Sequence, residues 1–166
     1  FVVPEGVSLL SNAPVQFVQT DVGWIQLPLS GASPDLAAAP EILGSVEMSS
    51  GSMLNGFRIV GTGDTLSEAG VVRMVGVSDV AVVNNQIWSR QEGIWIEDAM
   101  NATVTDNTVA QSLGSGILLM GGTGVTLTGN RVIASGGDGI EVLEGDSAEI
   151  VGNDIFSAIG NGISLV

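Results

Sequence analysis

A motif that recurs at a fixed interval constrains this chain more than any other feature of its sequence. Glycine followed by alternating aliphatic residues returns every 23 residues, at Gly93, Gly116, Gly139 and Gly162. A second motif, Asn-x-aliphatic, keeps the same interval and starts at Asn107, Asn130 and Asn153. Two markers in phase define a structural repeat, whose units cannot bury an apolar face alone and must stack on one another.

Each repeat unit contains short alternating runs and no helical pattern. Ile94 and Ile96 alternate after the glycine, and another run between the markers steps from Val104 to Leu127 and then to Ile150. Strict alternation over about four to six residues, bounded by Gly, Asn and Asp, is typical of strands with one buried face. The sequence therefore predicts an all-β parallel solenoid of about six to seven coils, with 22–23 residues in each regular coil.

Residues one period apart are expected to lie above one another, at the strand spacing of about 4.8 Å. Asn tolerates a left-handed backbone at a corner, and stacked amides can hydrogen-bond from coil to coil. We therefore expect an amide ladder formed by Asn85, Asn107, Asn130 and Asn153. We also equate Asn55 with Asn85, which makes this coil longer than the regular ones, and assign the eight extra residues to a loop at 61–70.

The length of 166 residues fits a single β-helix domain. We expect irregular first coils over residues 1–51 and regular coils over residues 52–166. An excursion is expected at 28–40, where Asp35 could cap a short helical turn that Pro40 stops. Neither end of the sequence shows a polar capping unit, so we expect a longer chain, another subunit or a partner to cover the strand edges.

The charge is strongly one-sided, with 18 acidic residues against four arginines and a net charge of −14. This balance argues against nucleic acid or an anionic membrane as a partner. No apolar run is long enough to span a bilayer, so membrane insertion is not expected. The absence of Cys excludes a disulfide-stapled fold and a thiolate metal site. A self-repelling soluble surface explains the charge most simply, with a high-salt habitat, a surface for divalent cations or resistance to trypsin-like proteases as alternatives.

The coils of 22 to 23 residues, with Gly-Ile-x-Ile openings and Gly-Asn-x-Ile/Val corners, resemble the parallel β-helix repeats of the pectate-lyase-like superfamily. The resemblance covers residues 52–166 well and residues 1–48 weakly. It implies a right-handed parallel β-helix. It leaves the function open, because this fold hosts lyases, hydrolases, epimerases, phage tailspikes, adhesins and passive scaffolds.

Enzymes that resemble this chain usually act on the outer face of the first sheet, where the resemblance places the Gly-Ile-x-Ile strands. A lyase would need carboxylates that hold Ca²⁺ beside a Lys or Arg base, and a hydrolase of this fold would need clustered Asp residues. The outward positions instead carry a mixed set of side chains: Arg73, Trp95, Leu118, Glu141 and Ser164. We therefore predict no catalytic residue.

Two kinds of ligand site have weaker support in the sequence. A glycan could stack on Trp95 between Arg73 and Glu97, although a loop or a neighbouring chain could equally cover this tryptophan. Calcium could bind at a turn that carries Glu144, Asp146 and Glu149, because Ca²⁺ prefers oxygen ligands. That turn lacks the spacing of known calcium loops, so a solvated acidic turn is the simpler interpretation, and no other cofactor is expected.

The sequence thus predicts an extracellular solenoid, secreted or displayed on a cell surface, with a structural or adhesive role. Its expected partners are other copies, assembled end to end or laterally, or other surface proteins. The alternative is a domain that binds or cleaves a polysaccharide on the outer face of the first sheet.

Overall fold

The computed structural model describes residues 1–11, 16–20, 23–27, 39–62 and 70–166. Most of the excursion expected at 28–40, with Asp35, and most of the loop expected at 61–70 lie outside the described residues. No helix in the described ranges is long and apolar enough to cross a membrane.

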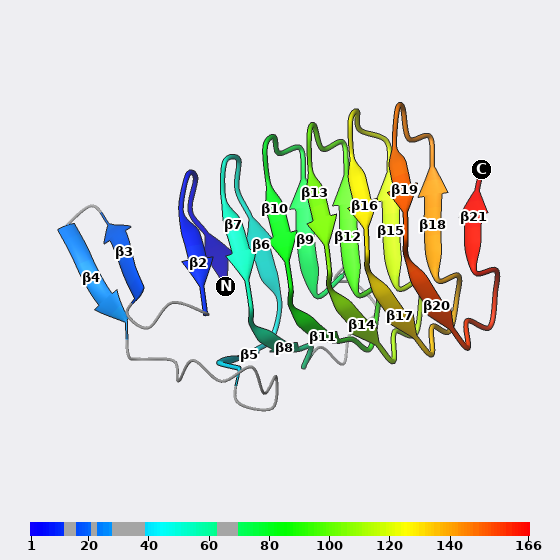
Figure 1. Cartoon of the computed structure of the whole chain (residues 1–166), viewed down its shortest axis with the longest axis horizontal. Coiled ribbons are helices and arrows are strands. Elements are labelled where there is room, and N and C mark those ends of the chain that lie inside the picture. The colour runs from blue at the N-terminus through cyan, green and yellow to red at the C-terminus, as the bar shows by residue number, and fades with distance from the viewer. Residues whose placement is uncertain (12–15, 21–22, 28–38, 63–69) are drawn as a thin grey trace.

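Short parallel strands form three sheets that run along the length of a solenoid (Figure 1). The first sheet has seven strands: β1 (Val2–Val3), β6 (Val46–Met48), β9 (Val72–Val75), β12 (Ile94–Glu97), β15 (Ile117–Met120), β18 (Ile140–Leu143) and β21 (Ile163–Leu165). The second has six: β2 (Ser8–Leu10), β7 (Met53–Asn55), β10 (Ala81–Val83), β13 (Thr103–Thr105), β16 (Thr126–Thr128) and β19 (Glu149–Val151). The third also has six: β5 (Glu41–Leu43), β8 (Arg58–Val60), β11 (Gln86–Trp88), β14 (Thr108–Ala110), β17 (Arg131–Ile133) and β20 (Asp154–Phe156).

The chain visits the three sheets in turn, so each full coil supplies one strand to each sheet. From β6 to β20 this order is unbroken, whereas an antiparallel pair, β3 (Gln16–Thr20) and β4 (Gly23–Leu27), interrupts the earlier coil between β2 and β5. The all-β parallel solenoid predicted from the sequence is confirmed, but it has about five turns rather than six to seven. The predicted number was too high because the first coil is interrupted and the last described coil contributes only β21.

The interior is built from stacked aliphatic columns, as the period predicts. Ile94 pairs with Ile117, which pairs in turn with Ile140, and all three side chains are fully buried. The same register places Val72 under Ile94, at a step slightly shorter than the regular interval. Like therefore stacks on like, and the core runs the length of the solenoid as one continuous cluster.

The glycine that opens the motif at Gly93, Gly116 and Gly139 is required for space between coils. A Cβ at Gly116 would collide with the side chain of Val132 and would lie 2.7 Å from the carbonyl oxygen of Gly139. Gly93 meets the equivalent atoms of Val109 and Gly116 in the same way. None of these glycines has a left-handed backbone. A side chain at Gly93 or Gly116 would therefore push neighbouring coils apart.

The expected asparagine positions are joined by hydrogen bonds along the solenoid. The side-chain nitrogen of Asn85 donates to the side-chain oxygen of Asn107 at 3.0 Å, and the same bond links Asn107 to Asn130 and Asn130 to Asn153. Each accepting oxygen also receives the backbone N–H of the preceding asparagine. The ladder thus satisfies buried backbone donors at a corner where the strands cannot.

Asn55 does not belong to this ladder, so its expected equivalence with Asn85 is wrong. The register pairs Arg58 with Gln86, which places Phe57 at the position of Asn85, and the backbone N–H of Phe57 donates to the Asn85 side chain at 3.0 Å. Phe57 is buried and fills the corner with apolar volume instead of an amide. The longer coil consequently has six extra residues rather than eight, because the register aligns Ile59 with Ile87 and Ile87 with Val109.

Candidate functional site

The outer face of the first sheet brings together the side chains expected there. Arg73 pairs with Trp95, and Trp95 pairs with Leu118 on the next strand. Glu97 follows Trp95 by two residues on β12 and therefore points to the same face. The candidate glycan-binding residues Arg73, Trp95 and Glu97 thus lie side by side, and their binding of a glycan remains a prediction.

The indole ring of Trp95 is held in place by its own strand. Its Nε1 donates a hydrogen bond of 3.0 Å to Oε2 of Glu97. Both side chains are half-buried, so the bond fixes the edge of the ring and leaves part of its surface accessible. The chain also covers part of this tryptophan, because a Cβ added at Gly70 would lie 2.6 Å from Cβ of Trp95.

Arg73, next to Trp95 in the sheet, has a donor that the protein does not use. Its Nε is buried and has no hydrogen-bond partner among the described residues. A buried unsatisfied donor costs about 1–3 kcal/mol.

The carboxylates on this face do not form a catalytic pair. Oε2 of Glu141 accepts a hydrogen bond of 2.7 Å from Oγ of Ser115, as Glu97 accepts one from Trp95. Glu97 and Glu141 stand two strands apart and are offset by two residues, which separates them by about 12 Å from strand geometry. Glycosidases need their two carboxylates about 5–9.5 Å apart. Glu97 and Glu141 are therefore too far apart to act together as the acid and base of a glycosidase.

The predicted calcium ligands lie beyond the carboxyl end of β18. Glu144 and Asp146 occupy the turn that follows this strand, and Glu149 is an exposed residue of β19. Across the ranges that the structure describes, no group of three or more His, Cys, Asp or Glu side chains is arranged to hold a metal ion. Calcium binding at this turn stays a prediction from the sequence.

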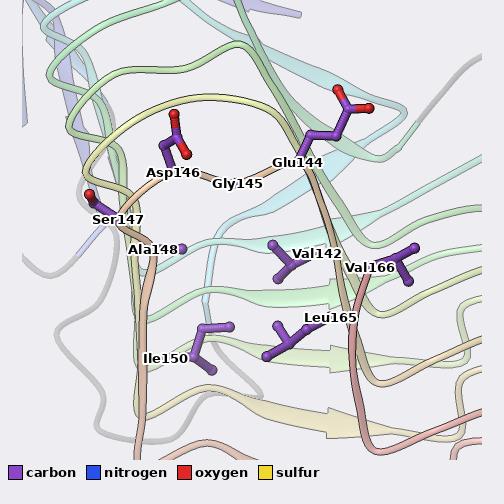
Figure 2. A pocket seen from close by; sticks show the side chains of 9 residues that line it. All are labelled: Val142, Glu144, Gly145, Asp146, Ser147, Ala148, Ile150, Leu165 and Val166. Carbon is purple, nitrogen blue, oxygen red and sulfur yellow. The ribbon is translucent and has the colours of Figure 1, made fainter.

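The same turn borders a pocket of about 770 Å³ at the last described coil. Figure 2 shows Val142, Ile150 and Leu165 projecting into it, with the carboxylates of Glu144 and Asp146 at its rim. The three aliphatic side chains occupy inward positions of their strands, and Leu165 is 71% exposed. The pocket is thus bordered by inward-facing aliphatic side chains on one side and by the acidic turn on the other.

The third sheet carries two contacts that the sequence analysis did not identify. The guanidinium of Arg58 lies 4.9 Å from the centre of the Trp88 ring, and that of Arg131 lies 4.9 Å from the centre of the Phe156 ring. In both pairs the arginine stands one strand before the aromatic residue and in the neighbouring column. The sequence feature that could have indicated these contacts is an arginine placed slightly more than one coil before an outward aromatic residue.

Comparison with known proteins supports the fold and gives no further information about the site. A family model described as a right handed beta helix region matches residues 47–166. No curated protein and no solved structure matches the chain.

Proposed function

Because the chain belongs to the right-handed β-helix family, we propose that it is a structural or adhesive solenoid that works outside the cytoplasm. The observation that carries this proposal is the outer face of the first sheet. Two of its carboxylates, Glu97 and Glu141, already accept hydrogen bonds from neighbouring side chains and stand too far apart to act together. A scaffold needs no reactive group on this face.

The construction of the interior favours the same conclusion. Buried aliphatic columns, an amide ladder and backbone hydrogen bonds tie every coil to its neighbours. Such a solenoid keeps surface side chains at multiples of the strand spacing, about 4.8 Å. Rigid, regular spacing suits a protein that presents or assembles surfaces, and the high net negative charge suits one that stays dispersed before assembly.

The chemical test exposes acidic and neutral polysaccharides to the purified chain and measures new reducing ends and unsaturated sugars. We expect neither product at any protein concentration. Cleavage by a monomeric chain that disappears in Glu97→Gln would overturn the structural role. The variant Glu47→Gln, at an exposed position of the same face, is the control for a general loss of charge.

Glycan binding without cleavage is the second candidate, favoured by the fixed indole of Trp95 beside the partly exposed side chain of Arg73. An oligosaccharide with an acidic group could stack on the ring while its oxygens accept from Arg73. Calorimetric titration with a panel of acidic and neutral oligosaccharides tests this. Binding should be lost in Trp95→Ala and kept in Trp88→Ala, whose ring lies on the third sheet. A heat of binding that is the same for Trp95→Ala as for the wild-type chain would exclude this site.

A further inference from the structure

We propose that the corner formed by residues 89–93 is a processing site for arginine-specific proteases. In the folded protein such a protease cuts the bond between Arg90 and Gln91 and no other, and both fragments remain in the solenoid. The step is hydrolysis, in which the C–N bond breaks while water supplies a hydroxyl group to the carbonyl carbon of Arg90 and a hydrogen to the nitrogen of Gln91. This inference goes beyond the proposed structural role and does not depend on it.

The sequence offers an arginine-specific protease very few bonds. The chain contains no Lys, and its four arginines are Arg58, Arg73, Arg90 and Arg131. All four lie within the described ranges. The way in which the fold holds these four positions therefore decides which bond is cut.

Three of the arginines lie inside strands that have a neighbour on both sides. Arg58 belongs to β8, between β5 and β11. Arg73 belongs to β9, between β6 and β12, and Arg131 belongs to β17, between β14 and β20. Proteolysis of a folded chain proceeds through a locally opened form. Each of these three strands would therefore have to leave its sheet before it could be cut.

The residue that follows each of these three arginines is part of the core. Ile59, Met74 and Val132 are all fully buried. Each apolar side chain of this size that must move from the core into water lowers the population of the opened form about 10- to 100-fold. The bonds after these three arginines are consequently protected by the core as well as by the sheets.

The corner at Arg90 differs from these positions in both respects. It lies between the end of β11 at Trp88 and the start of β12 at Ile94, and Arg90 is exposed. Residues 89–93 read Ser-Arg-Gln-Glu-Gly, so opening this corner removes no aliphatic side chain from the core. Exposed connections with small and polar residues are preferred sites of proteolytic nicking. The bond between Arg90 and Gln91 should therefore be cut first.

The side chain of Ser89 keeps this corner closed. Its hydroxyl donates to the backbone carbonyl oxygen of Glu92 at 2.8 Å and accepts the backbone N–H of Gln91, the nitrogen of the bond to be cut, at 2.9 Å. In an extended chain, residues three apart are separated by about 10 Å, so the bond to Glu92 must break before the corner can extend. The strength of these two hydrogen bonds thus sets how often the corner opens.

The two fragments share a complete junction between coils, which cleavage leaves intact. Residues 1–90 end after β11, and residues 91–166 begin before β12. Across this junction β9 pairs with β12, β10 with β13 and β11 with β14. The side chain of Asn85 also donates to that of Asn107 across it. Because cleavage removes none of these contacts, the fragments should stay together.

Time-resolved digestion of the folded chain with trypsin, analysed by mass spectrometry, tests this inference. We expect two products, residues 1–90 and 91–166, which elute together at the position of the intact chain in size-exclusion chromatography and separate in urea. Digestion of the urea-unfolded chain should cut after all four arginines, which shows that the fold and not the local sequence selects the bond. Arg90→Gln should leave the folded chain uncut, whereas Arg131→Gln should be cut as the wild type is.

A matched pair of serine variants tests the opening of the corner. Ser89→Ala should be cut about fivefold faster than the wild type, because the variant lacks the hydrogen bonds that hold the corner closed. Ser112→Ala is the control and should be cut at the wild-type rate, since this buried hydroxyl in the next coil has no partner among the described residues. Circular dichroism checks that both variants are folded.

Three results would overturn the inference: a first cut of the folded chain after Arg58, Arg73 or Arg131, a folded chain that resists trypsin while the unfolded chain is digested, or fragments that separate without denaturant. A Ser89→Ala variant that is cut no faster than the wild type would refute the role of the corner opening. None of these results bears on the structural role, which is tested by the release of sugar products.

Discussion

Replacing Gly116 with alanine tests whether the recurrent glycine exists for contact between coils. The added Cβ would collide with the Val132 side chain and would lie 2.7 Å from the carbonyl oxygen of Gly139. That oxygen cannot move freely, because it accepts the backbone N–H of Ile117 at 3.0 Å. Overpacking of this kind costs about 1–3 kcal/mol, and the lower entropy of the unfolded alanine chain offsets about 0.4–1 kcal/mol.

Because the carbonyl oxygen of Gly139 is fixed, the cost of overpacking should lie near the upper end of its range. We therefore expect Gly116→Ala to lower the free energy of unfolding by about 2 kcal/mol. In a chain of this length that corresponds to a fall in Tm of about 4–8 °C. The matched control is Gly162→Ala, which changes the same motif position in the last described coil, where an added Cβ meets nothing within 4 Å. Thermal unfolding followed by far-ultraviolet circular dichroism measures both. Equal effects in the two variants would refute the contact argument.

Four further substitutions examine the interior. Asn130→Ala should lower the free energy of unfolding by about 2–5 kcal/mol, because it removes the acceptor for two donors of Asn107. Urea denaturation measures this change. A loss below about 1 kcal/mol would contradict the role of the ladder. Ser112→Ala should leave the urea midpoint unchanged or raise it, since the buried hydroxyl of Ser112 has no partner among the described residues. Ser89→Ala should instead lower the free energy of unfolding by about 1 kcal/mol, because the Ser89 hydroxyl donates to a backbone carbonyl at 2.8 Å. The reverse order would refute this comparison. Ile117→Asp should prevent folding by burying an unpaired charge, and a variant with unchanged circular dichroism would mean that the inward column is wrongly assigned.

The interior could be predicted from the sequence because stacking gives equivalent residues the same surroundings. Ile94, Ile117 and Ile140 each meet branched aliphatic neighbours one coil away, so the same residue type satisfies each position and the period becomes visible. The amide ladder was predictable for the same reason. The prediction for Asn55 was wrong because its local sequence matches the Asn-x-aliphatic motif. In the structure Phe57 occupies the ladder position next to Asn85 and fills it with apolar volume.

The outward positions could be assigned to a face but not to a function. Nothing in the stacking restricts them, so Arg73, Trp95 and Leu118 can follow one another in a single column. The hydrogen bond from Trp95 to Glu97 depends on the rotamers of two side chains, which no period reveals. The stacks of Arg58 and Arg131 on aromatic rings lie on diagonals between coils, and a diagonal is apparent only after the register is known.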